Sequence, residues 1–235
     1  MFSRDVALRI FFLLVGTAPI ASLSGAIFDI VPLHISFKFV ILPAYGLAVI
    51  VGIAYWNVGR LALMGLIAGI IAVLLYDMTR WPWVITGLWG DFIPNIGGWM
   101  FDSSESNWVW GYLWRYIGNG GGMGMAFFMG YSLFHPLAKR PMSGTLYGLA
   151  VFSCLVGTLL LAPRAQEMLF TPSLLSVTMG AVGHIVFGSV LGYLAIRWED
   201  STLSSLQTGG MIDSVIRLSR ALGIRASNAA ESRSI

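Results

Sequence analysis

An acid and a base stand at the end of an otherwise hydrocarbon stretch of this chain. Residues 61–76 carry no charge, and Asp77 and Arg80 follow three residues apart. Side chains at positions i and i+3 lie on one side of a helix, so these two can form an ion pair. An ionised group at membrane depth is costly unless it is paired or faces a wet cavity. The pair is therefore either a structural clamp or part of a path for a solute or a proton.

Arg115 is a second base at such a depth. It lies seven residues after the start of the next apolar segment at 108, which places it about 10 Å along a helix. A buried guanidinium needs an acceptor, and Asp77 is the acid expected at the nearest depth. We therefore predict a contact between Arg115 and Asp77 with Arg80 nearby, and Asp29 and Asp91 are the next candidates.

Two sets of glycines recur at four-residue spacing along apolar segments. Such stripes let helix backbones approach closely in lipid. The sets are Gly180, Gly188 and Gly192, which flank His184, and Gly118, Gly120, Gly122 and Gly124. We expect the two segments to be close neighbours. His184 would then be buried and would need a hydrogen bond, for which Asn119 is the candidate partner.

The same histidine limits the cofactors that the chain can hold. A haem between two histidines needs both at comparable depth, whereas His34 and His135 are expected near the edges of the bilayer. A pair of His184 with Met123 or Met125 keeps haem as a minor alternative to the prediction of no cofactor. No metal site is predicted, because no other His, Cys or acid is expected at that depth. The GxSxG motif is absent and there are only three histidines, so we expect no enzyme.

The elements that must position these residues are membrane-spanning helices. The chain of 235 residues is 57% hydrophobic and 11% charged, against about 25% charged in soluble domains. Its formal charge of +3 gives no basic face for nucleic acid. A span needs about 20 mostly apolar residues. Six stretches meet this length, so we predict an all-α, polytopic transmembrane bundle over residues 1–198. The expected spans are 8–30, 35–56, 59–80, 108–134, 143–162 and 173–197.

Lysine and arginine placement predicts the orientation. With both termini in the cytoplasm, ten of these bases lie inside and four outside, which fits the positive-inside rule. We therefore expect a multi-pass protein of a bacterial-type inner membrane. Residues 8–30 also match a secretory signal, and the charge bias does not separate the two interpretations.

Two segments are not expected to be simple spans. Residues 108–134 carry Arg115, Asn119 and three successive glycines, which predicts a broken or partly re-entrant segment. Residues 81–107 form the longest connection, and seven of the nine tryptophans fall between 81 and 114. Indole rings favour the headgroup region, so we expect an external segment along the interface. The alternative is a lid over a site between helices, built from Asp91, Pro94 and Asn95.

The polar residues 199–235 are expected to form a cytoplasmic tail. Met211, Val215, Leu218 and Leu222 recur there at helical spacing. This pattern predicts a short amphipathic helix on the cytoplasmic leaflet.

Four short motifs give the chain a resemblance to other sequences. They are YDMTR at 76–80, Ile-Pro-x-Ile-Gly at 93–97, WRYIGNGGG at 114–122 and GHIVFGSVLG at 183–192. In this order they resemble the motifs of a group of uncharacterised bacterial multi-pass membrane proteins. The resemblance implies a helical inner-membrane protein and implies no activity.

Two classes of function remain. In the first, the protein is a non-catalytic scaffold, assembly factor or subunit of a larger membrane complex, with lipid and protein as its partners. In the second, it is a small-solute or proton-coupled permease with Asp77, Arg115 and His184 along the route. The permease requires these three residues to face one wet cavity, whereas the scaffold needs only separate helix contacts. The small number of polar residues favours the scaffold.

Overall fold

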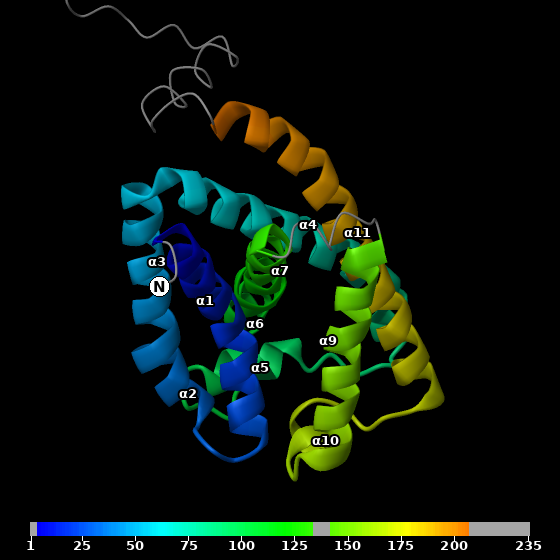
Figure 1. Cartoon of the computed structure of the whole chain (residues 1–235). Helices are drawn as coiled ribbons and strands as arrows, with labels where there is room; N and C mark the ends of the chain where they lie inside the picture. Colours follow the sequence, from blue (N-terminus) through cyan, green and yellow to red (C-terminus); the bar gives the residue numbers. More distant parts are fainter. Residues whose placement is uncertain (1–3, 134–141, 207–235) are drawn as a thin grey trace, which may run out of the picture.

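The structure is a computed structural model that describes residues 4–133 and 142–206, with side chains described up to Trp198 (Figure 1). Over these residues the chain forms helices and no strand, which confirms the predicted all-α bundle. The helices are α1 (Arg4–Ile27), α2 (Leu33–Ser36), α3 (Leu42–Ala54), α4 (Trp56–Ile85), α5 (Ile93–Trp99), α6 (Trp108–Leu113), α7 (Gly122–Leu133), α9 (Met142–Leu161), α10 (Ala165–Met168) and α11 (Leu174–Leu206). Two π-helical segments, Phe37–Ile41 and Trp114–Gly121, join α2 to α3 and α6 to α7. The predicted amphipathic helix at 211–222 lies outside the described residues.

Five helical stretches are long and apolar enough to cross a membrane. They are Arg4–Ile27, Leu33–Ala54, Trp56–Ile85, Met142–Leu161 and Leu174–Trp198. The predicted span 108–134 is formed by α6, the π-helical segment and α7 in direct succession. Over residues 108–133 the helix is unbroken with a π-helical middle, so the expected break is absent. This stretch is not among the five, and its partly re-entrant placement stays a prediction. The protein is a multi-pass helical membrane protein.

The π-helical segment Trp114–Gly121 carries two of the predicted site residues, Arg115 and Asn119. Its hydrogen bonds run from residue i to i+5, a pattern that is rare and occurs frequently at functional sites. The helix that leads into it begins at a defined cap, where the backbone N–H of Trp110 donates to Asn107 Oδ1 at 3.2 Å. Asparagine is among the preferred residues at this position. The start of α6 is thus encoded locally by Asn107, whose side chain accepts the backbone N–H of Trp110.

Helix α4 continues to Ile85, five residues past the expected end at 80. Trp81 and Trp83 therefore belong to the helix, and the connection to α6 begins only after them. Pro82 removes a single helical hydrogen bond. The helix ends at Ile85 with Thr86 as its C-cap, and Gly87, with φ of +73°, follows directly. Glycine adopts this left-handed conformation without a steric cost and is the common residue just beyond a helix end.

The glycines of the fourth span pack on α4 and α1. A Cβ added at Gly69 would meet the carbonyl oxygen of Gly120, and one at Gly65 would meet backbone atoms of Gly124 and Met125. Gly122 lies in the same way against Gly16 of α1. A larger residue would push these helices apart.

The glycine stripe of α11 packs on α9 instead. A Cβ added at Gly144 would meet backbone atoms of Gly188 and Gly192, and one at Gly148 would meet the carbonyl oxygen of His184. The expectation that this stripe faces the glycines of the fourth span is therefore wrong. Close approach needs small residues on both helices, and α9 supplies them with its own pair at four-residue spacing.

Not every predicted glycine contact is a tight one. A Cβ at Gly118 would lie 3.4 Å from Pro19 Cβ, and one at Gly180 would lie 3.2 Å from a ring carbon of Phe152. Both neighbours are side-chain atoms rather than backbone. These two positions therefore tolerate a small side chain better than the helix-pairing glycines do.

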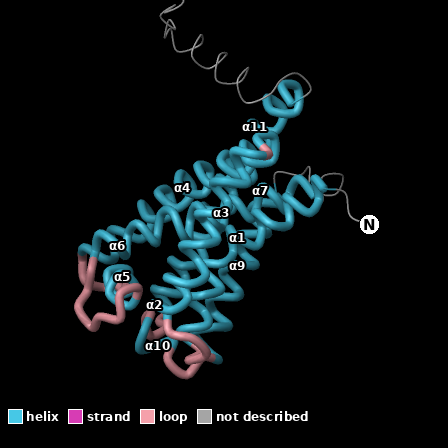
Figure 2. Tube along the Cα trace, turned by 90° about the vertical axis from the view of Figure 1, so that its left-hand side faces the viewer, coloured by secondary structure: helices cyan, strands magenta, loops and turns pink. Residues whose placement is uncertain are grey.

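The short helices and the longer loops gather at one end of the bundle. Figure 2 shows α2, α5 and α10 with their loops at this end, whereas the end of α11 lies at the opposite one. We call it the loop end. A buried cluster there joins α1, α5, α9 and α10, and its members include Ile27, Ile93, Ile96, Leu159 and Met168.

Candidate functional site

Asp77 of α4 and Arg115 of the π-helical segment form a buried ion pair. Arg115 Nη2 donates to Asp77 Oδ1 at 2.7 Å, and Arg115 Nε lies 3.2 Å from Oδ1 and 3.4 Å from Oδ2. Arg80 Nη1 is 3.8 Å from the same Oδ1. Asp77 and Arg80 are each 2% exposed, and Arg115 is 8% exposed. The structure thus brings together the three residues that the sequence analysis expected to meet.

Asp91 extends this group into a network of ion pairs. Its Oδ1 pairs with Arg80 Nη2 and accepts the backbone N–H of Ile93 at 3.2 Å. Its Oδ2 accepts the hydroxyl of Tyr112 at 2.8 Å. Two carboxylates therefore balance two guanidinium groups, and the network ties α4, the start of α5 and α6 together.

Aromatic rings cover the two guanidinium groups. Arg115 Cζ lies 4.5 Å from the ring centre of Tyr76, and Arg80 Cζ lies 5.8 Å from that of Trp89 and 5.6 Å from that of Phe92. A cation over an aromatic face gains about 0.5–2 kcal/mol, more where water is excluded. Sequence reasoning missed these rings and Tyr112. The run of aromatic residues close to each charge was the available signal.

Pro94 and Asn95 attach α5 to the start of α6. The carbonyl of Pro94 accepts the backbone N–H of Asn107 at 2.9 Å, and Asn95 Oδ1 accepts the hydroxyl of Ser106 at 2.6 Å. A Cβ at Gly97 would meet the carbonyl oxygen of Asn107. The connection is therefore packed onto backbone across the loop end.

His184 bonds within its own helix. Its Nδ1 lies 2.7 Å from the carbonyl oxygen of Gly180. A carbonyl only accepts, so Nδ1 carries the proton and Nε2 is left as the second ring nitrogen. The ring packs edge-on against Tyr76 at 5.1 Å and 87°, and against Phe152 at 5.4 Å. The expected hydrogen bond to Asn119 is replaced by this carbonyl, because a helical residue always has the i−4 carbonyl within reach.

A cavity of about 430 Å³ lies between α1 and α9 and reaches the ion-pair network. Four of the predicted site residues line it together: Arg80, Arg115, Asn119 and His184. Asp77 does not line it, because it lies behind the arginines that it pairs with. The remaining walls are mostly apolar and come from six parts of the chain.

The connection before α6 closes the loop end of this cavity. Phe92, Ile93 and Ile96 line it, whereas Pro94, Asn95 and Asp91 do not. The alternation follows the short helix α5, whose buried side carries Ile93 and Ile96. Asp91, Pro94 and Asn95, which were expected to build a lid, thus hold the connection before α6 in place. Their apolar neighbours Phe92, Ile93 and Ile96 cover the cavity.

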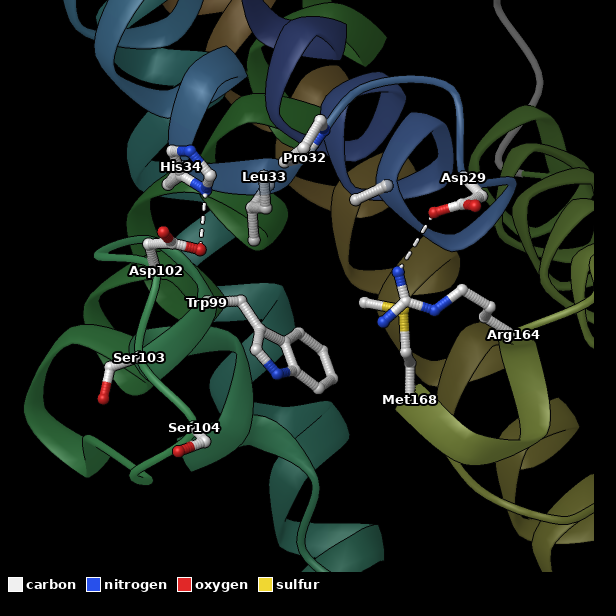
Figure 3. A pocket seen from close by; sticks show the side chains of 11 residues that line it. Asp29, Pro32, Leu33, His34, Trp99, Asp102, Ser103, Ser104, Arg164 and Met168 are labelled. Atoms are coloured by element: carbon white, nitrogen blue, oxygen red, sulfur yellow. Dashed lines mark hydrogen bonds and ion pairs between the residues drawn. The ribbon is translucent and has the colours of Figure 1, made fainter.

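A second cavity of about 300 Å³ lies at the loop end (Figure 3). Two polar contacts border it: His34 Nδ1 lies 3.3 Å from Asp102 Oδ1, and Arg164 Nη1 forms an ion pair with Asp29 Oδ1 at 3.2 Å. Both acids have left-handed backbones, with φ of 59° at Asp29 and 58° at Asp102. Asp29, a lesser candidate partner for Arg115, is therefore engaged elsewhere. These pairs join three connections of the chain to one another.

Among the described residues, no group of three or more His, Cys, Asp and Glu side chains is placed to hold a metal ion. Met123 lines the larger cavity together with His184, and its Sδ lies 3.7 Å from the hydroxyl of Tyr147. Haem between these two residues stays a minor prediction. No protein-family model, no curated protein and no solved structure matches this chain.

Proposed function

We propose that this membrane protein is a permease that holds an apolar or amphiphilic small molecule in the cavity between α1 and α9. One observation carries the proposal: Arg115 and His184, from different helices, line a single cavity, whereas Asp77, the third residue expected on the route, lies outside it. A purely structural clamp does not need this convergence. Ligand sites are concave, mostly apolar and oriented by a few polar groups.

The size and walls of the cavity define the class of cargo. Its volume of about 430 Å³ lies within the range of about 300–1,000 Å³ for small-molecule sites. Along α1 and α9 it is walled by Ile20, Leu23, Val151 and Leu155. A strongly hydrated solute would lose its water there without compensation. The walls therefore favour a hydrophobic cargo over the polar solute or proton first considered.

The second candidate is a non-catalytic scaffold, assembly factor or complex subunit. The ion pairs favour this candidate, because Asp77 and Asp91 already neutralise Arg115 and Arg80 within the protein. The arginines then need no ligand to balance their charge. In both candidates the proposed location is a bacterial-type inner membrane with both termini in the cytoplasm, as the placement of lysine and arginine predicts.

Blocking the cavity tests the permease. Ala150 of α9 lines the cavity and is exposed, so Ala150→Trp places an indole inside it. Leu161 on the same helix is 77% exposed and does not line the cavity, so Leu161→Trp is the matched control. The proteins are extracted with native lipid into nanodiscs, and native mass spectrometry records the molecules that stay bound.

We expect a bound small molecule of defined mass on the wild-type protein and on Leu161→Trp, and its loss from Ala150→Trp. Equal retention in both variants, or stoichiometric protein partners and no small molecule, would favour the scaffold instead.

A further inference from the structure

We propose that the cavity takes an amphiphile from the bilayer whose head carries hydrogen-bond-accepting oxygen atoms, and that Arg80, Trp89 and Trp114 hold this head. The inference rests on the proposed function and names the chemical class of its ligand. It goes beyond a hydrophobic cavity because it assigns the polar end of the molecule and the residues that recognise it.

Three buried side chains at the loop end of the cavity carry donors without acceptors. Nε and Nη1 of Arg80, Nε1 of Trp89 and Nε1 of Trp114 have no hydrogen-bond partner among the described residues. The three residues are only 2%, 4% and 4% exposed, and all three line the cavity. Buried donors are nearly always paired in folded proteins, so such a group of exceptions points to a missing acceptor.

The chemistry of these groups fixes the polarity of the head. Guanidinium and indole nitrogens only donate. The nearby acids do not supply these hydrogen bonds. Arg80 Nη1 lies 3.8 Å from Asp77 Oδ1, beyond hydrogen-bond distance, and Asp77 accepts from Arg115 instead. Asp91 accepts from Tyr112 and pairs with Nη2 of Arg80. A carbonyl, ester, carboxylate or phosphate oxygen completes the site, whereas an ammonium head would face other donors.

The nitrogens are covered by the cavity wall in this conformation. The head therefore reaches them when the indole and guanidinium groups turn toward the cavity. The faces of Trp89 and Phe92 pack against the Arg80 guanidinium, with Cζ 5.8 Å and 5.6 Å from the ring centres, and neither ring is hydrogen-bonded to it.

The mouth of the cavity faces the bilayer. Ala21 of α1, and Ala150 and Cys154 of α9, line the cavity and are exposed. These small residues lie within the length of two spanning helices, so the opening between them is at membrane depth. In the view of Figure 1, α1 and α9 flank α7 on its two sides. An amphiphile can enter sideways, with its tail along α1 and α9 and its head at the loop end.

Cys154 provides a built-in reporter, since it is the single cysteine of the chain and lines the cavity. The protein in nanodiscs is labelled with N-ethylmaleimide, and the labelling rate is measured with four probes of equal chain length. The probes are methyl dodecanoate, dodecanoate, dodecylammonium and dodecane. Comparing the protection by methyl dodecanoate with that by dodecanoate shows whether the site prefers a neutral or an anionic acceptor.

We expect at least one acceptor probe to protect Cys154 about tenfold better than dodecylammonium and dodecane do, which corresponds to one or two hydrogen bonds. In Trp89→Phe and in Trp114→Phe this preference, measured against the unprotected labelling rate of the same variant, should fall toward that of dodecane. The phenylalanine variants keep a six-membered aromatic ring and remove the N–H donor together with the five-membered ring of the indole.

The control moves the reporter to an exposed position outside the cavity, at the end of the same helix. In the variant Cys154→Ser with Leu161→Cys, no probe should slow labelling, because Leu161 is 77% exposed and outside the cavity. Equal protection of Cys154 by dodecane or dodecylammonium would overturn the acceptor head and leave the proposed function standing. Protection by none of the four probes would overturn both.

Discussion

Replacing Asp77 by asparagine should remove a large part of the stability of this protein. The carboxylate is 2% exposed and accepts from Arg115 at 2.7 Å, with Arg80 Nη1 3.8 Å away. In the variant Arg115 faces a neutral amide at membrane depth, whereas Arg80 keeps Asp91. Removal of one partner from a buried ion pair costs about 3–5 kcal/mol, because the other charge stays buried without compensation.

Thermal unfolding in a gentle detergent measures this cost. For a chain of this length, about 1 kcal/mol lowers the Tm by about 2–4 °C. The expected fall for Asp77→Asn is therefore about 6–20 °C. Asp29→Asn is the matched control, since it makes the same chemical change in a pair whose side chains are 73% and 45% exposed. Such an exposed pair contributes about 0–1 kcal/mol to the free energy of unfolding. The Tm of Asp29→Asn should therefore fall by less than about 4 °C.

A double-variant cycle isolates the pair itself. Asp77→Asn combined with Arg115→Gln should be less destabilised than the sum of the two single variants, by about 0.5–3 kcal/mol. Two results together would contradict a role of Asp77 in compensating the buried charge on Arg115. The Tm of Asp77→Asn would equal that of Asp29→Asn, and the effects of the two single variants in the cycle would be additive.

Three further variants test the packing and the network by the same unfolding measurement. Gly188→Ala should lower the free energy of unfolding by about 1–3 kcal/mol, because its Cβ would clash with the Gly144 backbone. Gly157→Ala should lose nothing, since no atom lies within 4 Å of that Cβ, and equal losses at both would contradict the close contact of α9 with α11. Tyr112→Phe should lose about 1–3 kcal/mol, because it removes a donor of Asp91, and a neutral result would contradict that bond. Asn107→Ala should lose about 0.5–2 kcal/mol through the lost cap, and an unchanged Tm would mean that α6 does not depend on it.

The spans and the central ion pair could be predicted from the sequence because each has a local signal. Apolar stretches of membrane length give the helices directly. The depth of a charge along its span follows from the rise per residue, and depth alone matched Arg115 to Asp77. Arg80 followed from its three-residue spacing to that acid.

The pairing of helices and the cavity could not be predicted in the same way. Glycine stripes occur on α4, α7, α9 and α11, and spacing alone does not say which stripe meets which. His184 was expected to need a partner on another helix, yet the carbonyl of Gly180 on its own helix satisfied it. The cavity depends on how far α1 stands from α9, which is a property of the whole assembly. Its polar residues Arg115, Asn119 and His184 stood out in the sequence one by one, but nothing there showed that they share a cavity. Trp89 and Trp114 were explained by the headgroup region without a ligand.

The most direct test of the account is an experimental density map of the protein extracted with its native lipids. We expect an elongated molecule between α1 and α9 that enters the cavity at Cys154, with its polar end within hydrogen-bond distance of Arg80, Trp89 or Trp114. Direct packing of α1 on α9, with no space between them, would contradict it.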